Sequence, residues 1–193
     1  GRARIVKIDS RRVKEALASG CVAVVAGFQG ADERGEITTI GRGGSDTSAV
    51  ALAAALEANV CEIYTDVEGV ATADPRICRK ARMLPVISYE EMMELADAGA
   101  KVMHARAVEL AAKFRVPLVV RSSFAEGPGT CVVSEEDAME GTVVSGITCN
   151  TGEAKVAIRR VPDKIGVTAT IFKPIAKAGI DVDLIVQNVA ADG

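Results

Sequence analysis

The chain has 193 residues, of which 49% are hydrophobic, 25% are charged and 3% are aromatic, and its formal net charge is -3. Because this composition supplies neither a basic footprint nor aromatic stacking residues, nucleic acid is excluded as the expected partner and small-molecule chemistry fits better. No apolar run approaches the roughly 18 to 20 residues that span a membrane, and the N-terminus has no signal-peptide pattern, so we expect no membrane partner and a cytoplasmic location.

The first elements of the chain are predicted to be a helix and a buried strand. Residues 10–19 have apolar positions at helical spacing, and Gly20 closes this helix. Residues 21–26 form a continuous apolar run, which is typical of a strand covered on both faces. The run ends at residues 27–30, where glycines allow a loop to approach a ligand closely. A polar, hairpin-like segment follows at residues 31–36.

A glycine turn at residues 38–48 runs into an alanine-rich helix that continues to residue 56. Such a turn exposes backbone N–H groups at the positive end of the helix dipole, where an anion can bind. Arg42 adds a guanidinium group that suits a carboxylate or a phosphate. Ser45 and Asp46 are also good N-cap residues, so the same pattern fits an ordinary helix start.

Residues 60–66 are predicted to be the next strand, with a loop at residues 67–76. Two strands separated by one helix make a βαβ unit, in which the strands are parallel and the crossover is right-handed. Ligands bind beyond the carboxyl ends of the strands in such sheets. We therefore expect residues 27–30, the glycine turn and the loop to surround one crevice.

Two helices and a strand follow the loop. Ser88 and Glu91 have the spacing of a capping box, which starts a helix that stops near Gly99 with Met92, Met93, Leu95 and Ala96 facing inward. Residues 101–114 return to helical spacing. Residues 116–121 are predicted to be a buried strand, with Pro117 confined to its beginning.

The cysteines and the single histidine show no catalytic or metal-binding pattern. The five cysteines are odd in number and lack C-x-x-C spacing, which indicates buried, reduced thiols in a cytoplasmic protein. His104 has no Ser or Cys partner pattern, so we interpret it as a packing or hydrogen-bonding residue. We expect no metal site formed by the chain itself.

The composition changes between residues 122 and 146, where Gly, Pro and acidic residues indicate a solvated connector and a domain boundary. Beyond it, the pattern predicts a half-exposed strand at 154–161, an amphipathic helix at 166–178 and a second strand at 180–189. Together these form one β-α-β half of a ferredoxin-like fold. Pro174 should kink or shorten the helix, at a cost of about 3 kcal/mol.

In their order along the chain, these motifs resemble aspartokinases of the amino-acid kinase superfamily, and the tail resembles the first ACT regulatory domain of those enzymes. The resemblance implies an α/β class with a three-layer α/β/α fold and a mainly parallel sheet over residues 1–134. A linker at 135–146 and a partial, ferredoxin-like ACT domain at 147–193 would follow. The motifs that carry the resemblance lie at residues 3–6, 27–30, 38–56, 64–76, 88–95, 99–110, 116–123, 163–166 and 178–188.

The resemblance also implies a role for individual residues. Arg42, Gly43, Gly44 and Ser45 match the aspartate-binding turn, and Asp46 matches a catalytic residue that organises the groups around the transferring phosphoryl. The positions that match the ATP-binding loops are Thr65, Asp66, Ala71, Thr72, Ala73, Asp74, Pro75, Arg76 and Lys101. The positions that match effector-binding residues are Asp163, Lys164, Gly166, Asp181, Asp183 and Gln187.

The implied reaction moves the γ-phosphoryl group of ATP to the β-carboxylate of L-aspartate and gives 4-phospho-L-aspartate, the first step of lysine, threonine and methionine biosynthesis. The acceptor carboxylate is already ionised at neutral pH, so the site needs charge neutralisation and alignment more than a general base. ATP would enter as its Mg²⁺ complex, with the ion held mainly by phosphates. Feedback by lysine, threonine or both, and a homo-oligomer formed through ACT domains, are also implied.

Other interpretations stay open at this point. Asp66 and Asp74 also fit ordinary turn residues, and Lys101 fits a solvated helix cap. The family's Lys-Phe-Gly-Gly segment and second ACT domain are not found in the sequence, so we expect a fragment of a longer enzyme that is inactive and self-associating in isolation. Ile165 stands where a proline is usual and Asp181 where an asparagine is usual. A non-catalytic, dimerising module that binds a nucleotide or an amino acid is the alternative function, and a kinase acting on glutamate is a weaker one.

Overall fold

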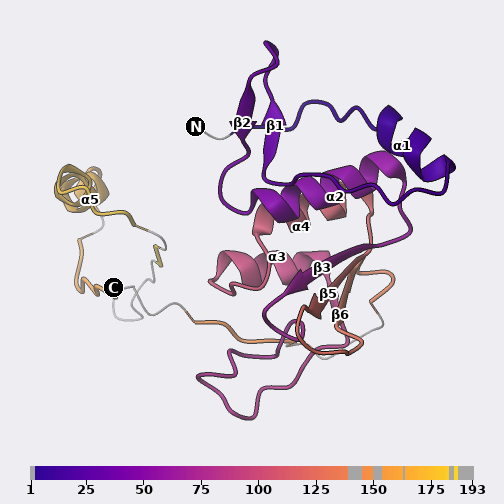
Figure 1. Ribbon diagram of the computed structural model, residues 1–193. Coiled ribbons are helices and arrows are strands. Elements are labelled where there is room, and N and C mark those ends of the chain that lie inside the picture. The colour runs from indigo at the N-terminus through magenta and orange to yellow at the C-terminus, as the bar shows by residue number, and fades with distance from the viewer. Residues whose placement is uncertain (1–2, 139–144, 150–153, 163, 183–184, 187–193) are drawn as a thin grey trace. The chain divides into compact units, whose positions relative to one another are not determined.

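The computed structural model describes residues 3–138, 145–149, 154–162, 164–182 and 185–186 (Figure 1). Backbone contacts divide the chain into two compact units, Gly1–Thr151 and Gly152–Gly193. The first unit contains a helical layer packed on a sheet, and the second contains one described helix. None of the helices within the described residues is long and apolar enough to cross a membrane.

The N-terminal part of the first unit contains the expected helix and a hairpin. Helix α1 (Arg11–Ala18) matches the predicted helix. Strands β1 (Gln29–Ala31) and β2 (Ile37–Thr39) pair in antiparallel fashion and confirm the hairpin-like segment. At its tip, the Asp32 carboxylate accepts hydrogen bonds from two backbone N–H groups, each at 2.9 Å, as turn-forming Asp residues commonly do.

The predicted strand at residues 21–26 is wrong, because the structure gives this segment no strand pairing. Val22 and Val24 expose 91% and 95% of their surface, although the apolar pattern predicted burial on both faces. A strand forms only where a neighbour accepts its hydrogen bonds, and no strand within the described residues lies beside this segment. The predicted βαβ unit that depended on it is therefore not formed.

The core sheet of the first unit has the order β3-β5-β6-β4. Strands β3 and β5 are parallel, as are β4 and β6, while β5 and β6 are antiparallel, so the α/β class with a mainly parallel sheet is confirmed. The predicted strand at 60–66 is confirmed as β3. Pro117 lies just before β5 and accepts a hydrogen bond from Cys61 at 2.9 Å, which suits a residue without an N–H to donate. The strand bounds are Cys61–Thr65 (β3), Val86–Ser88 (β4), Leu118–Ser122 (β5) and Thr130–Val133 (β6).

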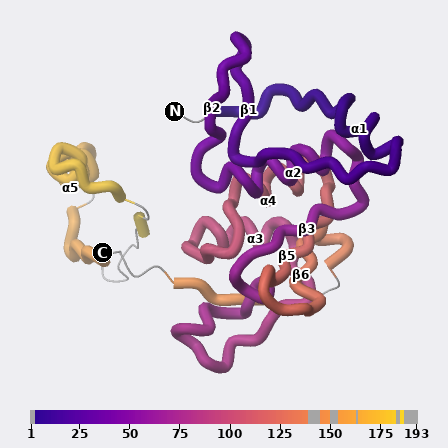
Figure 2. The backbone as a smooth tube through the Cα atoms, viewed as in Figure 1, coloured from indigo at the N-terminus to yellow at the C-terminus, as the bar shows by residue number. Residues whose placement is uncertain are grey.

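Three helices pack on this sheet: α2 (Gly44–Leu56), α3 (Tyr89–Asp97) and α4 (Ala105–Phe114), as Figure 2 shows. The predicted capping box is present, because the Ser88 hydroxyl accepts from Glu91 and the Glu91 carboxylate accepts from Ser88. Helix α4 begins four residues later than predicted, because His104 is extended and acts as its N-cap. Met92 is fully buried, as expected, among a core of helical and strand side chains.

The second unit contains the predicted helix as α5 (Val167–Lys177). This helix passes through Pro174 and continues for three residues, so the proline does not end it. The predicted strand at residues 154–161 is wrong, since these residues pair with no described strand and Val156 is 81% exposed. Of the predicted strand at 180–189, the described residues 180–182 and 185–186 have no strand conformation, and the others lie outside the described residues.

Candidate functional site

The glycine turn has left-handed backbone conformations that only glycine adopts easily. Gly41 and Gly43 have φ values of 98° and 69°, and Gly43 is the N-cap of α2 without any side-chain capping bond. The carbonyl of Gly43 accepts from the backbone and the hydroxyl of Thr47, at 3.1 and 2.8 Å. The N–H groups of Ser45 and Asp46 meet no acceptor among the described residues. Ser45 and Asp46 therefore do not act as N-caps, and their N–H groups are left open at the helix start.

The loop at residues 27–30 lies against this turn, as the sequence predicted. The Ser48 hydroxyl accepts from the N–H of Phe28 at 3.2 Å and donates to the Ser45 carbonyl at 2.9 Å. A Cβ at Gly44 would lie 3.0 Å from the Phe28 ring, and a Cβ at Gly27 would lie 3.1 Å from the Ser48 hydroxyl. These positions are glycine because the two segments approach each other so closely.

The two charged residues of the turn differ, because Arg42 has no ion-pair partner among the described residues whereas Asp46 accepts a hydrogen bond. Arg42 is exposed, and it forms no ion pair with any residue that the structure describes. Asp46 is half-buried in the first turn of α2 and accepts from the Ser45 hydroxyl at 3.4 Å. Burial raises the pKa of the Cys61 thiol, and the negative charges of Asp46 and Glu62 raise it further. Cys61 is thus held as a neutral thiol in the core.

The loop between β3 and β4 is anchored by a buried hydroxyl. Thr130, on β6, accepts from the N–H of Val70 at 2.8 Å and donates to the carbonyl of Leu84 at 2.6 Å. The two ends of this loop are also joined at Thr72 and Arg82. The N–H of Thr72 donates to the Arg82 carbonyl at 2.8 Å, and the N–H of Arg82 donates to the Thr72 hydroxyl at 3.0 Å. We call residues 69–84 the anchored loop.

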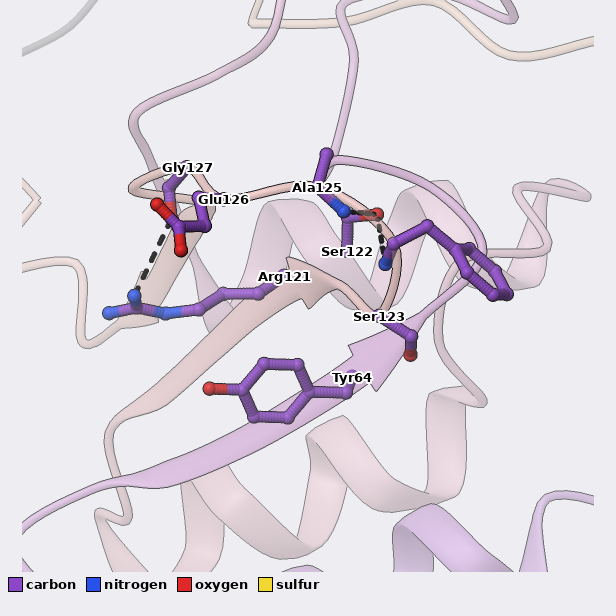
Figure 3. Close-up of a pocket in the computed structure, with 8 residues that line it drawn as sticks. Tyr64, Arg121, Ser122, Ser123, Ala125, Glu126 and Gly127 are labelled. Carbon is purple, nitrogen blue, oxygen red and sulfur yellow. Dashed lines mark hydrogen bonds between the residues drawn. The ribbon is translucent and has the colours of Figure 1, made fainter.

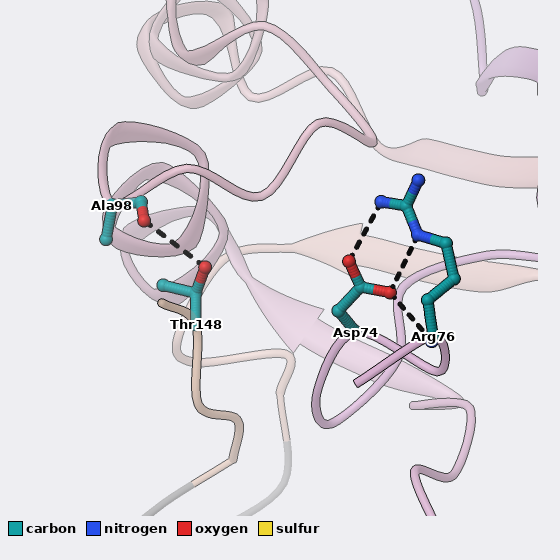
Figure 4. Close-up of polar contacts among 4 residues, drawn as sticks. All are labelled: Asp74, Arg76, Ala98 and Thr148. Atoms are coloured by element: carbon teal, nitrogen blue, oxygen red, sulfur yellow. Dashed lines mark hydrogen bonds and ion pairs between the residues drawn. The ribbon is translucent and has the colours of Figure 1, made fainter. Parts of the chain in front are cut away.

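Asp74 and Arg76 form a bidentate ion pair in the anchored loop (Figure 4). The guanidinium Nε and Nη2 atoms donate to the two carboxylate oxygens at 3.0 and 2.8 Å, and the Arg76 N–H donates at 2.9 Å. Arg76 holds the pKa of the Asp74 carboxyl below its usual range, and the positive charge of Lys101 lowers it further. Asp74 in turn raises the pKa of Arg76, with a smaller contribution from Asp66. Four of the predicted ATP-binding residues thus influence one another's charge: Asp66, Asp74, Arg76 and Lys101.

A cavity of about 540 Å³ lies beyond the carboxyl ends of β3 and β5, next to Thr65 (Figure 3). Arg121 lies 3.0 Å from the Glu62 carboxylate through its Nε atom, in an orientation that makes an ion pair without a hydrogen bond there. The sequence reasoning missed this cavity, although polar residues directly after a predicted strand could have indicated it. Its lining residues are Tyr64, Arg121, Ser122, Ser123, Phe124, Ala125, Glu126 and Gly127.

The segment 145–149 contacts both α3 and the anchored loop, which the sequence did not predict. The N–H of Ile147 donates to the Thr72 carbonyl at 2.8 Å. The Thr148 hydroxyl donates to the Ala98 carbonyl at 3.2 Å (Figure 4), and the Ser145 hydroxyl donates to Glu91. The hydrogen bond of Ser145 lowers the pKa of the Glu91 carboxyl against the opposing effect of burial, which is the largest single influence.

The remaining predicted positions fall in two groups. Thr65, Ala71 and Ala73 are half-buried, whereas Pro75 is exposed, and all four lie at the end of β3 or in the anchored loop. Among the effector positions, Lys164, Gly166 and Asp181 are exposed, and Gly166 is the N-cap of α5. Asp163, Asp183 and Gln187 lie outside the described residues.

Residues 1–122 match the model of the amino acid kinase family. The chain is 56% identical over 192 residues to the aspartate kinase Ask_LysC of Stutzerimonas stutzeri, covering 99% of this chain and 47% of that protein. The chain therefore spans about half the length of the curated relatives it matches.

Solved structures give the same result. Aspartate kinase from Synechocystis superposes with a TM-score of 0.59 at 44% identity, over 92% of this chain and 31% of that one. Aspartokinase III of E. coli, in complex with lysine and aspartate, superposes with a TM-score of 0.56 at 31% identity, over 84% and 37% of the two chains. The same enzyme has also been solved with aspartate and ADP.

Proposed function

Because this chain belongs to the amino acid kinase family, we propose that it is part of an aspartate kinase and that its glycine turn holds the acceptor amino acid. The observation that carries the proposal is the open anion site at the start of α2. The same turn carries two N–H groups without an acceptor among the described residues, at Ser45 and Asp46, and the exposed, unpaired side chain of Arg42. This combination suits the carboxylates of aspartate, and the curated relatives at 50% identity or more are aspartate kinases or aspartokinases.

In this proposal, Arg42 and the open N–H groups of Ser45 and Asp46 hold the carboxylates of aspartate, and Gly43 and Gly44 shape the turn that presents them. The β-carboxylate then attacks the γ-phosphorus of ATP, the bond from that phosphorus to the bridging oxygen breaks, and ADP leaves. No proton is removed from the nucleophile at neutral pH, so the protein contributes alignment and charge stabilisation. Asp46 organises the groups around the transferring phosphoryl from its fixed place in the first turn of α2.

The nucleotide would lie along the anchored loop and the end of β3. Lys101 is exposed and close enough to Asp74 to lower its pKa, which supports a place for its ammonium group beside the phosphates. The described residues contain no group of three or more His, Cys, Asp or Glu that could hold a metal ion. In the proposal, Mg²⁺ would be held mainly by the phosphates of ATP, where it would neutralise their charge.

Regulation and assembly are part of the same proposal. E. coli aspartokinase III has been solved with lysine, which supports a feedback amino acid, lysine or threonine, at the second unit. Lys164, Gly166 and Asp181, together with Asp163, Asp183 and Gln187, would bind it. Homo-oligomers would form through this unit, in the cytoplasm, where the five free thiols of the chain stay reduced.

The test is a hydroxylamine-trapping assay on the full-length protein that contains this chain. We expect ATP-dependent formation of aspartyl hydroxamate from L-aspartate and a much lower rate with L-glutamate at the same concentration. A faster rate with glutamate would assign a different acceptor. Nucleotide binding without any acyl phosphate would support the non-catalytic alternative, and it would contradict the proposed activity.

A further inference from the structure

Arg106, in the first turn of α4, holds the chain just before the glycine turn. Its Nη1 atom donates to the carbonyl of Ile40 at 3.3 Å, and its Nη2 atom donates to the carbonyl of Ala3 at 2.7 Å. Both acceptors are far away in the sequence, by 66 and 103 residues. One guanidinium group thus ties α4 to the N-terminal segment and to the residue that precedes Gly41.

The Ile40 backbone is fixed from both sides. Its side chain is buried, its N–H donates to the Phe28 carbonyl at 3.0 Å, and its carbonyl receives Arg106. Gly41 follows directly in a left-handed conformation, so the orientation of the Ile40 peptide sets the direction in which the turn leaves β2. The bond from Arg106 is long, at 3.3 Å, but its charged donor strengthens it relative to a neutral donor in the same place.

The other side of the turn is fixed by the same helix. The ring of His104, the N-cap of α4, occupies the space that a Cβ at Gly43 would fill. Arg106 contacts Ile40 and His104 contacts Gly43. Arg42, which carries the free guanidinium, lies between these two contact points in the sequence. His104 and Arg106 therefore contact the backbone of the turn at two points, Gly43 and Ile40.

We propose that Arg106 is a positioning residue for the acceptor site, which holds the glycine turn so that Arg42 and the open N–H groups converge on one carboxylate. The inference rests on the proposed function. Arg106 acts on the turn and not on the anchored loop, because that loop is held by Thr130 through separate hydrogen bonds. Its loss should therefore weaken the binding of aspartate and leave the binding of ATP unchanged.

The kinetic test compares Arg106→Ala, Arg106→Lys and Lys113→Ala in the full-length protein. We expect Arg106→Ala to raise the KM for aspartate on the order of tenfold, with the KM for ATP changed by less than about twofold. Arg106→Lys keeps the charge and one donor, so it should restore part of the loss. Lys113→Ala removes the same charge from the exposed C-terminal turn of α4 and should match the parent protein.

A second measurement does not depend on activity. Hydrogen exchange should accelerate in a peptide covering residues 38–48 of Arg106→Ala and stay unchanged in residues 69–84. Equal acceleration in both peptides, or equal changes in both KM values, would overturn the proposal by showing a general loss of stability. No change in either readout would also overturn it. Selective exchange in a protein that does not phosphorylate aspartate would support the positioning role and reject only the proposed function.

Discussion

The glycine turn and the anchored loop are both candidate anion sites, yet their polar groups are used in opposite ways. At the turn, Arg42 and the N–H groups of Ser45 and Asp46 have no partner among the described residues. In the anchored loop, Arg76 is already bound to Asp74 by two side-chain hydrogen bonds. A partner-free cation is available to a ligand, whereas a paired one mainly shapes the loop. We therefore expect the turn to bind the acceptor, and the Asp74–Arg76 pair to shape the loop along which the nucleotide would lie.

The largest effect is expected from Asp46→Asn, which keeps the shape of the turn and removes its negative charge. In the full-length protein, kcat should fall by at least about 100-fold, because preorganised charges at the reacting group act on the transition state. Both KM values should change little. Steady-state kinetics with a coupled ADP assay would check this. Turnover near that of the parent protein would mean that Asp46 serves only the helix dipole at the start of α2.

The comparison predicts that Arg42→Ala weakens aspartate binding by about 10- to 100-fold, since a charge-assisted hydrogen bond to a carboxylate contributes about 1.5 to 3 kcal/mol. The KM for ATP should stay the same. Arg34→Ala is the matched control, because Arg34 is an exposed arginine at the tip of the β1–β2 hairpin. If the KM for aspartate did not change, the turn would have to be abandoned as the acceptor site.

Thr130→Val tests how the anchored loop is held, because it keeps the side-chain shape and removes the hydroxyl. The N–H of Val70 and the carbonyl of Leu84 would lose a buried partner, so the free energy of unfolding should fall by about 1 to 3 kcal/mol. Denaturant unfolding of the full-length protein would measure it. Thr130→Ser keeps the hydroxyl and should retain most of the stability. An equal loss in both variants would assign the effect to packing instead.

The smallest effect concerns pH. Arg76 holds the pKa of Asp74 below its usual range, so the pair stabilises the loop above that usual value, and this contribution is lost as the pH falls toward the lower folded pKa. Carboxyl NMR titration should show an Asp74 pKa below the usual range for aspartate, and Arg76→Gln should raise that pKa. Arg79→Gln, an exposed change in the same loop, should leave the titration unchanged. An Asp74 pKa that does not respond to Arg76→Gln would contradict the pairing.

Local signals in the sequence were sufficient for several elements. The capping box at Ser88 and Glu91, the glycine turn before α2 and the apolar run of β3 are each specified by neighbouring residues, and the structure confirms them. The N-cap position within the turn was not predictable, since Ser45 and Asp46 have better capping side chains than Gly43. Glycine is required there by a left-handed backbone and by the ring of His104, a residue 61 positions away, which fills the space of a Cβ.

The pairing of strands from distant segments could not be predicted from the sequence. Residues 21–26 have the composition of a buried strand, but no described strand offers them hydrogen bonds. Strands β4 and β6 were not predicted, because each is only three or four residues long. Neither segment contains a pattern that would indicate its parallel pairing with the other. The cavity beside Tyr64 was missed for the same reason, since it arises where β3 and β5 end together.

The close contact between Gly43 and His104 means that a substitution at one position is expected to depend on the residue at the other. Any side chain at position 43 would occupy the space of the imidazole ring, and the φ of 69° adds a backbone penalty for most residues other than glycine. A mutational library that varies position 43 alone should therefore recover only glycine. A library that varies both positions should recover Asn at position 43 together with a small residue at position 104. Natural substitutions at position 43 are expected to be accompanied by the same change at position 104.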